Sequence, residues 1–152
     1  MKLLLPLAAT ALAGCMATVP GAPPVVVECQ MPTQSVRAGP ALVGETYGMK
    51  MTPLPVNSVQ FGSQATAQAM AVQSLFAERS QTDTVQVTAR FVSCLDRPSS
   101  VRVRTSFLRA STAPAEAPTA WKTVYLEPRA TAVYSELSTV QDVASYLIEV
   151  AQ

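Results

Sequence analysis

Apolar and polar residues alternate well along two segments in the second half of the chain, residues 84 to 92 and residues 100 to 108. A period of two residues is typical of a strand that buries one face and exposes the other. The expected inward positions are Val85, Val87, Ala89 and Phe91 in the first segment and Val101, Val103, Thr105 and Phe107 in the second. The pattern therefore predicts two half-buried strands, with arginines among the outward positions.

Turn-forming residues separate these segments from further short apolar runs. The break LDRPSS lies between them, and the loop ASTAPAEAPTA follows the second. Two more strands are expected in WKTVYLEP and ATAVYSEL, joined by a Pro-Arg turn, and a last one from about Ser145. Short strands at this spacing, with turns between them, are typical of an antiparallel sandwich.

Two segments fit helix and strand patterns equally well. Residues 63 to 80 are rich in helix formers, and residues 140 to 150 carry apolar residues at both spacings. Period alone does not separate the two structures in short apolar runs. Residues 64 to 69 stay open between helix and strand, whereas residues 70 to 79 are expected to form a strand paired across SQTDT with the next. The expected fold is mainly β: an antiparallel immunoglobulin-like β-sandwich, with room for one short helix.

The N-terminus has the pattern of an export signal. A lysine precedes an apolar run from Leu3 to Gly14, which is shorter than the roughly 20 residues that a membrane-spanning helix needs. A positive start, a short apolar centre and small residues at the end are typical of a secretory signal peptide. The closing Leu-Ala-Gly-Cys resembles the lipobox of bacterial lipoproteins. The resemblance implies cleavage before Cys15 and a diacylglyceryl group on its sulfur; the alternative is an ordinary signal peptide cut elsewhere, with Cys15 incidental.

A lipidated Cys15 would anchor the mature chain permanently, because two or three acyl chains hold a protein at a bilayer where one does not. Residue 16 is Met, and not the Asp that tends to retain lipoproteins in the inner membrane of enteric bacteria. The lipoprotein resemblance therefore implies an outer-membrane location, facing the periplasm.

Proline divides the chain into parts, since seven of the twelve prolines lie between residues 16 and 56. Proline opposes helix formation, and the segment that follows Cys15 has little apolar surface to bury. An extended tether is therefore expected there. Within the loop-rich region that follows, VVVEC is expected as a first strand and GETYGMKM as a short hairpin or edge strand. The expected division is a signal peptide (1–14), a tether (15–24) and one sandwich domain (25–152), loop-rich over 28–66 and with its core in 70–151.

Composition narrows the classes of function. The chain has eleven basic residues, ten acidic residues and no histidine. Such a balanced charge argues against nucleic-acid binding, which needs a basic footprint. Histidine is the commonest metal ligand and proton carrier near neutral pH, so we expect no metal site and no cofactor. Motifs of serine hydrolases, Ser-Lys enzymes and phosphate-binding loops are absent from the sequence, so the chain is not expected to be an enzyme.

Cys29 and Cys94 form an even pair once Cys15 is assigned to the lipid. Disulfides persist in an oxidising compartment such as the periplasm. A bridge would close a long loop, which contributes about 4 kcal/mol in the chain-entropy model, and would fasten the N-terminal segment to the domain. Two buried free thiols and a zinc site stay as alternatives, although two thiolates without histidine make a poor zinc site.

Arginine is the unevenly distributed charge, because five arginines crowd into residues 90 to 109. Alternation places Arg90, Arg102 and Arg104 on the outward face of what we expect to be neighbouring strands. One interpretation is a solvated sheet face. The other is a contact patch for a partner protein, a lipid headgroup phosphate or a cell-wall carboxylate. Trp121 is expected in the core, since a sandwich of this size needs a large residue to fill it.

Three stretches, VQVTARFV, VRVRTSFL and AWKTVYLEPRATAVYSEL, are similar in order to the YcfL-like small lipoproteins of Gram-negative bacteria. The resemblance covers about residues 70 to 151 and implies an immunoglobulin-like sandwich without implying an activity. Two hypotheses of function follow. The first is a lipid-anchored interaction or structural module that docks on a periplasmic partner protein, within an envelope or secretion assembly. The second is a ligand-binding or inhibitor-like lipoprotein that uses one sheet face.

Overall fold

The computed structural model describes Cys29, residues 38 to 51 and residues 59 to 152. The predicted signal peptide, Cys15, the tether and all of the predicted first strand except Cys29 lie outside these described residues. In the described part of the chain, no helix is long and apolar enough to span a bilayer.

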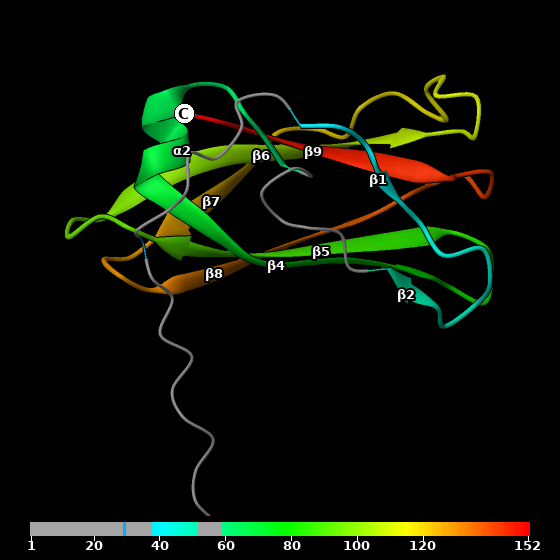
Figure 1. Cartoon of the computed structure of the whole chain (residues 1–152), viewed down its shortest axis with the longest axis horizontal. Coiled ribbons are helices and arrows are strands. Elements are labelled where there is room, and N and C mark those ends of the chain that lie inside the picture. Colours follow the sequence, from blue (N-terminus) through cyan, green and yellow to red (C-terminus); the bar gives the residue numbers. More distant parts are fainter. Residues whose placement is uncertain (1–28, 30–37, 52–58) are drawn as a thin grey trace, which may run out of the picture.

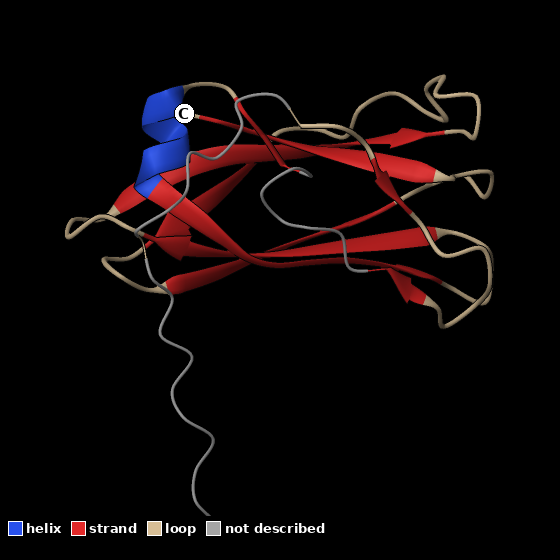
Figure 2. Ribbon diagram, in the orientation of Figure 1, coloured by secondary structure: helices blue, strands red, loops and turns tan. Residues whose placement is uncertain are grey.

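Two sheets pack face to face as stacked layers (Figures 1 and 2). Every strand pair is antiparallel except β3 with β9, which is parallel. The predicted antiparallel β-sandwich is therefore confirmed. Sheet I has the order β1 (Ala41–Leu42), β9 (Ser145–Ala151), β6 (Ser99–Leu108) and β7 (Lys122–Leu126), with β3 (Val59–Phe61) also paired to β9. Sheet II has the order β2 (Lys50–Met51), β4 (Met70–Arg79), β5 (Val85–Ser93) and β8 (Thr131–Leu137).

The segment whose sequence fitted both helix and strand divides at Met70. Residues Gln64–Ala69 form the helix α2, because the Ser63 hydroxyl accepts a hydrogen bond from the Thr66 backbone N–H at 3.1 Å and so caps the first turn. From Met70 the chain continues as β4, which pairs with β5 across the predicted turn. The helix lies at one end of the sandwich (Figure 1). The expected edge strand in GETYGMKM is β2, and the turn before it uses Gly48 at a φ of 76°.

The core fills the space between the sheets with the inward residues that the alternation predicts. All four inward side chains of β5 are fully buried, and those of β6 are at most 3% exposed. The largest fully buried side chains are Tyr146, Phe61, Phe91, Phe107, Met70 and Leu75. Burial of such side chains contributes about 1.5–3 kcal/mol each, which makes this layer the main source of stability.

Trp121 is not part of the core, which corrects the prediction made from its size. It is 39% exposed, because Val124 and Leu126 of β7 turn inward and the alternate positions therefore face solvent. Tyr125 shares the outward parity of Trp121 and is 76% exposed. The core is instead filled by aromatic residues of strands β3, β5, β6 and β9.

The three outward arginines do not share a face, which corrects a second prediction. Strands β5 and β6 are consecutive in sequence but belong to different sheets. The chain crosses from sheet II to sheet I between Ser93 and Ser99. Arg90 therefore lies on the outer face of sheet II, and Arg102 and Arg104 lie on the outer face of sheet I, on opposite sides of the sandwich.

Candidate functional site

Strand β6 brings Arg102 and Arg104 to the outer face of sheet I, between the strands β7 and β9. Arg104 lies opposite Glu149 in the ladder with β9. Its Nε donates to Glu149 Oε2 at 2.7 Å and its Nη2 donates to Glu149 Oε1 at 3.2 Å. The hydrogen bond with Glu149 raises the pKa of the Arg104 guanidinium. This two-pronged pair holds the guanidinium in one orientation.

Trp121, the residue directly before β7, lies beside these two arginines. The Cζ atom of Arg104 lies 4.5 Å from the centroid of the Trp121 ring, and that of Arg102 lies 5.8 Å from it. A cation over an indole ring at an exposed position contributes about 0.5–1 kcal/mol. Arg102 also donates through Nη2 to the backbone oxygen of Gln152 at 2.9 Å. We call Arg102, Arg104, Trp121 and Tyr125 the arginine–tryptophan face.

The arginine–tryptophan face has the chemistry of a protein contact. Trp, Tyr and Arg are the residue types that most often dominate binding energy at protein interfaces. Stacking and the pair with Glu149 restrain Trp121 and Arg104 before any partner arrives, so less side-chain entropy is lost on binding. Glu149 pairs with Arg104, and no side-chain carboxylate of the described residues pairs with Arg102, so this face offers a guanidinium to a partner. Among the described residues, no group of three or more acidic or cysteine side chains is placed to hold a metal ion.

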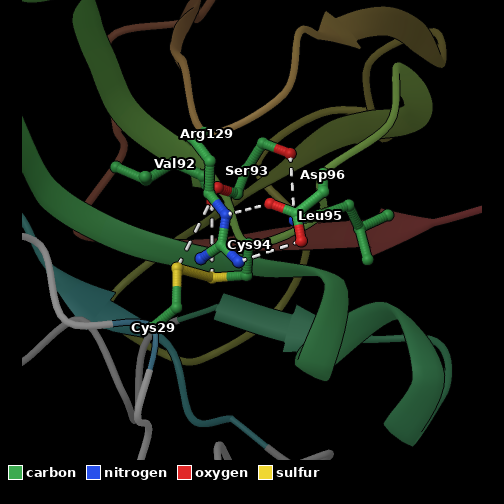
Figure 3. The surroundings of a disulfide bond; sticks show 7 residues. All are labelled: Cys29, Val92, Ser93, Cys94, Leu95, Asp96 and Arg129. Atoms are coloured by element: carbon green, nitrogen blue, oxygen red, sulfur yellow. Dashed lines mark hydrogen bonds and ion pairs between the residues drawn. A yellow bond between two sulfur atoms is a disulfide. The ribbon is translucent and has the colours of Figure 1, made fainter.

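Cys29 and Cys94 lie at disulfide distance, with their Cα atoms 5.5 Å apart, as the sequence predicts. Cys94 directly follows β5, and its backbone N–H donates to the Ala69 oxygen at the end of α2 at 2.9 Å. Figure 3 shows the bond beside Arg129, whose side chain extends toward Asp96. The bridge thus fastens the segment at Cys29 to the end of sheet II.

The structure brings together two of the three predicted contact arginines and adds residues that the sequence reasoning missed. Arg90 lies apart from the other two, while Trp121 and Glu149 join them. The sequence did indicate that Trp121 is exposed, because it shares one face of the strand with Thr123 and Tyr125, and Val124 lies on the other face. Glu149 carried no such signal, since its pairing with β6 joins residues far apart in sequence.

Comparison with solved structures finds the same fold in two bacterial proteins. The crystal structure of the Campylobacter jejuni protein cj0090 matches with a TM-score of 0.53 and 10% sequence identity, over 62% of this chain and 97% of that one. A DUF1425 family member from Shewanella sp. PV-4 matches with a TM-score of 0.50 and 12% identity, over 55% of this chain and 77% of that one. No protein-family model matches the sequence, and no curated protein matches it. At these identities the likeness concerns the fold alone.

Proposed function

We propose that this protein is a lipid-anchored, outer-membrane module of the bacterial envelope that docks through its arginine–tryptophan face on an acidic surface of a periplasmic partner protein. The observation that carries the docking is the stacking of Arg104 on an exposed Trp121, with the Cζ atom 4.5 Å from the ring centroid. Exposed Trp121 and Tyr125, together with the two arginines, are the residue types that are enriched at protein interfaces. The guanidinium that this face offers favours a partner that supplies carboxylates.

The anchor part of the proposal is supported by the sequence Leu-Ala-Gly-Cys ending at Cys15 and by the similarity to YcfL-like lipoproteins. The fold found in two bacterial proteins is compatible with that similarity. The disulfide adds a geometric consequence. At about 3.4 Å for each extended residue, the chain from Cys15 to Cys29 reaches at most about 50 Å. A domain fastened at Cys29 therefore stays close to the bilayer, where envelope assemblies are found.

The docking is tested by cross-linking and affinity capture of the full-length chain from native envelopes, followed by quantitative mass spectrometry. We expect the double variant Arg102→Glu/Arg104→Glu, and separately Trp121→Ala, to lower the yield of a specific partner at least tenfold. Arg90→Glu is the control on the opposite sheet: it reverses one charge, as Arg104→Glu alone does, and should leave the yield unchanged, whereas Arg104→Glu alone should already lower it. Circular dichroism confirms that every variant folds. Equal partner yields from the face variants and the control would overturn the docking.

The anchor is tested separately with Cys15→Ser. The native chain should fractionate with outer membranes and carry acyl groups by mass spectrometry, and the variant should not. Membrane association of Cys15→Ser, together with a native chain free of lipid, would overturn the anchor and leave the docking experiment to stand on its own result.

A further inference from the structure

A hollow of about 430 Å³ opens on the outer face of sheet II, beside the disulfide and on the opposite side of the sandwich from the arginine–tryptophan face. Its volume lies within the range of small-molecule sites. We call it the disulfide hollow. The lining residues are Cys29, Gln73, Arg90, Val92, Ser93, Arg129 and Thr131.

Gln73 brings an unpaired hydrogen-bond acceptor to the disulfide hollow. The register of β4 and β5 shifts between Val72 and Ser74, so Gln73 is the extra residue of a β-bulge. Its side-chain oxygen Oε1 is buried and accepts no hydrogen bond from any residue that the structure describes. A buried acceptor left without a donor is unfavourable. A ligand hydroxyl or N–H donor would remove that penalty once the Gln73 side chain turns its oxygen toward the hollow, and bulges often serve to aim a side chain at a site.

Two arginines bring positive charge to the same hollow. Arg90 of β5 makes one side-chain hydrogen bond, from Nη2 to the Thr131 hydroxyl at 3.4 Å, and pairs with no carboxylate among the described residues. Arg129 pairs with Asp96 through Nε at 2.7 Å and Nη2 at 3.3 Å, and no acceptor in the described part of the chain bonds its Nη1.

The backbone at Arg129 is held in an unfavourable conformation. Its φ is 55°, in the left-handed region that costs a residue other than glycine about 1 kcal/mol or more. The backbone N–H of Arg129 donates to the Leu95 oxygen at 3.2 Å, so this turn is fastened beside the disulfide. The turn presents the Arg129 side chain across the disulfide (Figure 3). Strain of this kind is often retained where a side chain has to be positioned.

From these contacts we infer that the disulfide hollow binds an oxyanion that carries neighbouring hydroxyl groups, the chemistry shared by sugar carboxylates and by phosphate esters of polyols. Arg90 and the Nη1 group of Arg129 bind the oxyanion by charge-assisted hydrogen bonds. The Gln73 side chain turns its Oε1 toward the hollow to accept a hydrogen bond from a ligand hydroxyl, and the Thr131 hydroxyl bonds a neighbouring hydroxyl of the ligand. Val92 and the disulfide provide the apolar wall. This site is independent of the proposed docking, because it lies on the other sheet.

The binding is tested by NMR titration of the full-length chain with four probes: glycerol 3-phosphate, glucuronate, sulfate and N-acetylglucosamine. We expect saturable shifts centred on the amides of Gln73 and Thr131 with glycerol 3-phosphate, glucuronate or both, and their ratio tells phosphate ester from sugar acid. Sulfate, which offers no hydroxyl, should bind at least tenfold more weakly. Neutral N-acetylglucosamine should not bind. Absence of saturation by both hydroxylated anions at about 10 mM, a free energy of about −3 kcal/mol, overturns the inference.

Two variants test separately the contact of Arg90 with the anion and the contact of Gln73 with a ligand hydroxyl. Arg90→Gln should lower the affinity for every anion at least tenfold. Gln73→Leu should remove the preference for glycerol 3-phosphate or glucuronate over sulfate while sulfate binding persists. Arg104→Gln, on the other sheet, is the matched control and should bind as the native chain does. An unchanged affinity of Arg90→Gln for the anions overturns the inference. Capture of the partner protein by the same variant shows whether the docking stands independently.

Discussion

Two tyrosines illustrate at the residue scale how a buried hydroxyl is satisfied or left alone. Both are at most 2% exposed. The Tyr134 hydroxyl shares a hydrogen bond with the Thr105 hydroxyl at 3.0 Å, whereas the Tyr146 hydroxyl has no hydrogen-bond partner within the described ranges. Burial raises the pKa of both phenols. The neutral phenol is therefore the form that the folded state favours at each position.

Tyr146→Phe is expected to raise the free energy of unfolding by about 1 kcal/mol at pH 7, because it deletes an unpaired buried hydroxyl. Tyr134→Phe, the matched control, should lower it by about 1 kcal/mol because it leaves Thr105 unpaired. The pKa of the Tyr146 phenol is higher in the folded chain than in the unfolded chain, where it is about 10. As the pH rises above about 10, the unfolded chain loses this proton first, and the native chain becomes less stable. The advantage of Tyr146→Phe should therefore grow above about pH 10. Urea unfolding measures both effects, and a less stable Tyr146→Phe at pH 7 would contradict this account.

At the scale of elements, Arg79 joins three loops at one end of the sandwich. It ends β4 and is only 9% exposed. Its guanidinium donates to four backbone oxygens, those of Gly44, Asp83, Gln141 and Val143. These oxygens belong to the segment between β1 and β2, the β4–β5 hairpin and the segment before β9. No carboxylate among the described residues pairs with Arg79, so backbone dipoles alone compensate its charge.

Arg79→Met should lower the free energy of unfolding by about 3–5 kcal/mol, because it keeps the apolar stem and leaves four carbonyl groups without their donor. Arg90→Met makes the same change at an exposed position of the same sheet and should alter the value by less than about 0.5 kcal/mol. Urea denaturation of the two variants beside the native chain makes the comparison. Similar unfolding midpoints for both variants would show that the three loops do not depend on Arg79.

At the scale of the whole molecule, the disulfide connects the segment at Cys29 to Cys94, across a sequence separation of 65 residues. The core is formed by the two sheets, and the described strands do not include residue 29. The bridge therefore restricts the unfolded chain and holds Cys29 at the end of β5. It is not required to complete the core.

Cys29→Ser/Cys94→Ser should lower the free energy of unfolding by about 4 kcal/mol in the chain-entropy model while the sandwich still folds. The native chain with a reductant should show the same loss, and the double variant should not respond to that reductant. Urea unfolding followed by circular dichroism measures the difference. A native chain that unfolds at the same urea concentration with and without reductant would be incompatible with a bonded pair.

Local pattern was sufficient for the strands of the second half of the chain. The alternation in residues 84–92 and 100–108 predicted which side chains of β5 and β6 are buried, because successive side chains of any strand point to opposite faces. The pairing of β4 with β5 followed from a short turn between apolar runs. The pairing of Cys29 with Cys94 followed from counting cysteines. Each of these inferences needs only neighbouring residues or composition.

Tertiary structure decided what local pattern leaves free. Alternation gives the parity of each side chain but not the sheet to which its strand belongs, so it did not separate Arg90 from Arg102. The exposure of Trp121, its contact with Arg104, and the hollow between Gln73 and Arg129 arise from pairings between distant strands. The strand order follows from how the chain crosses between two layers to bury both apolar faces at once. That choice depends on the packing of the whole core, and no short stretch of sequence carries it.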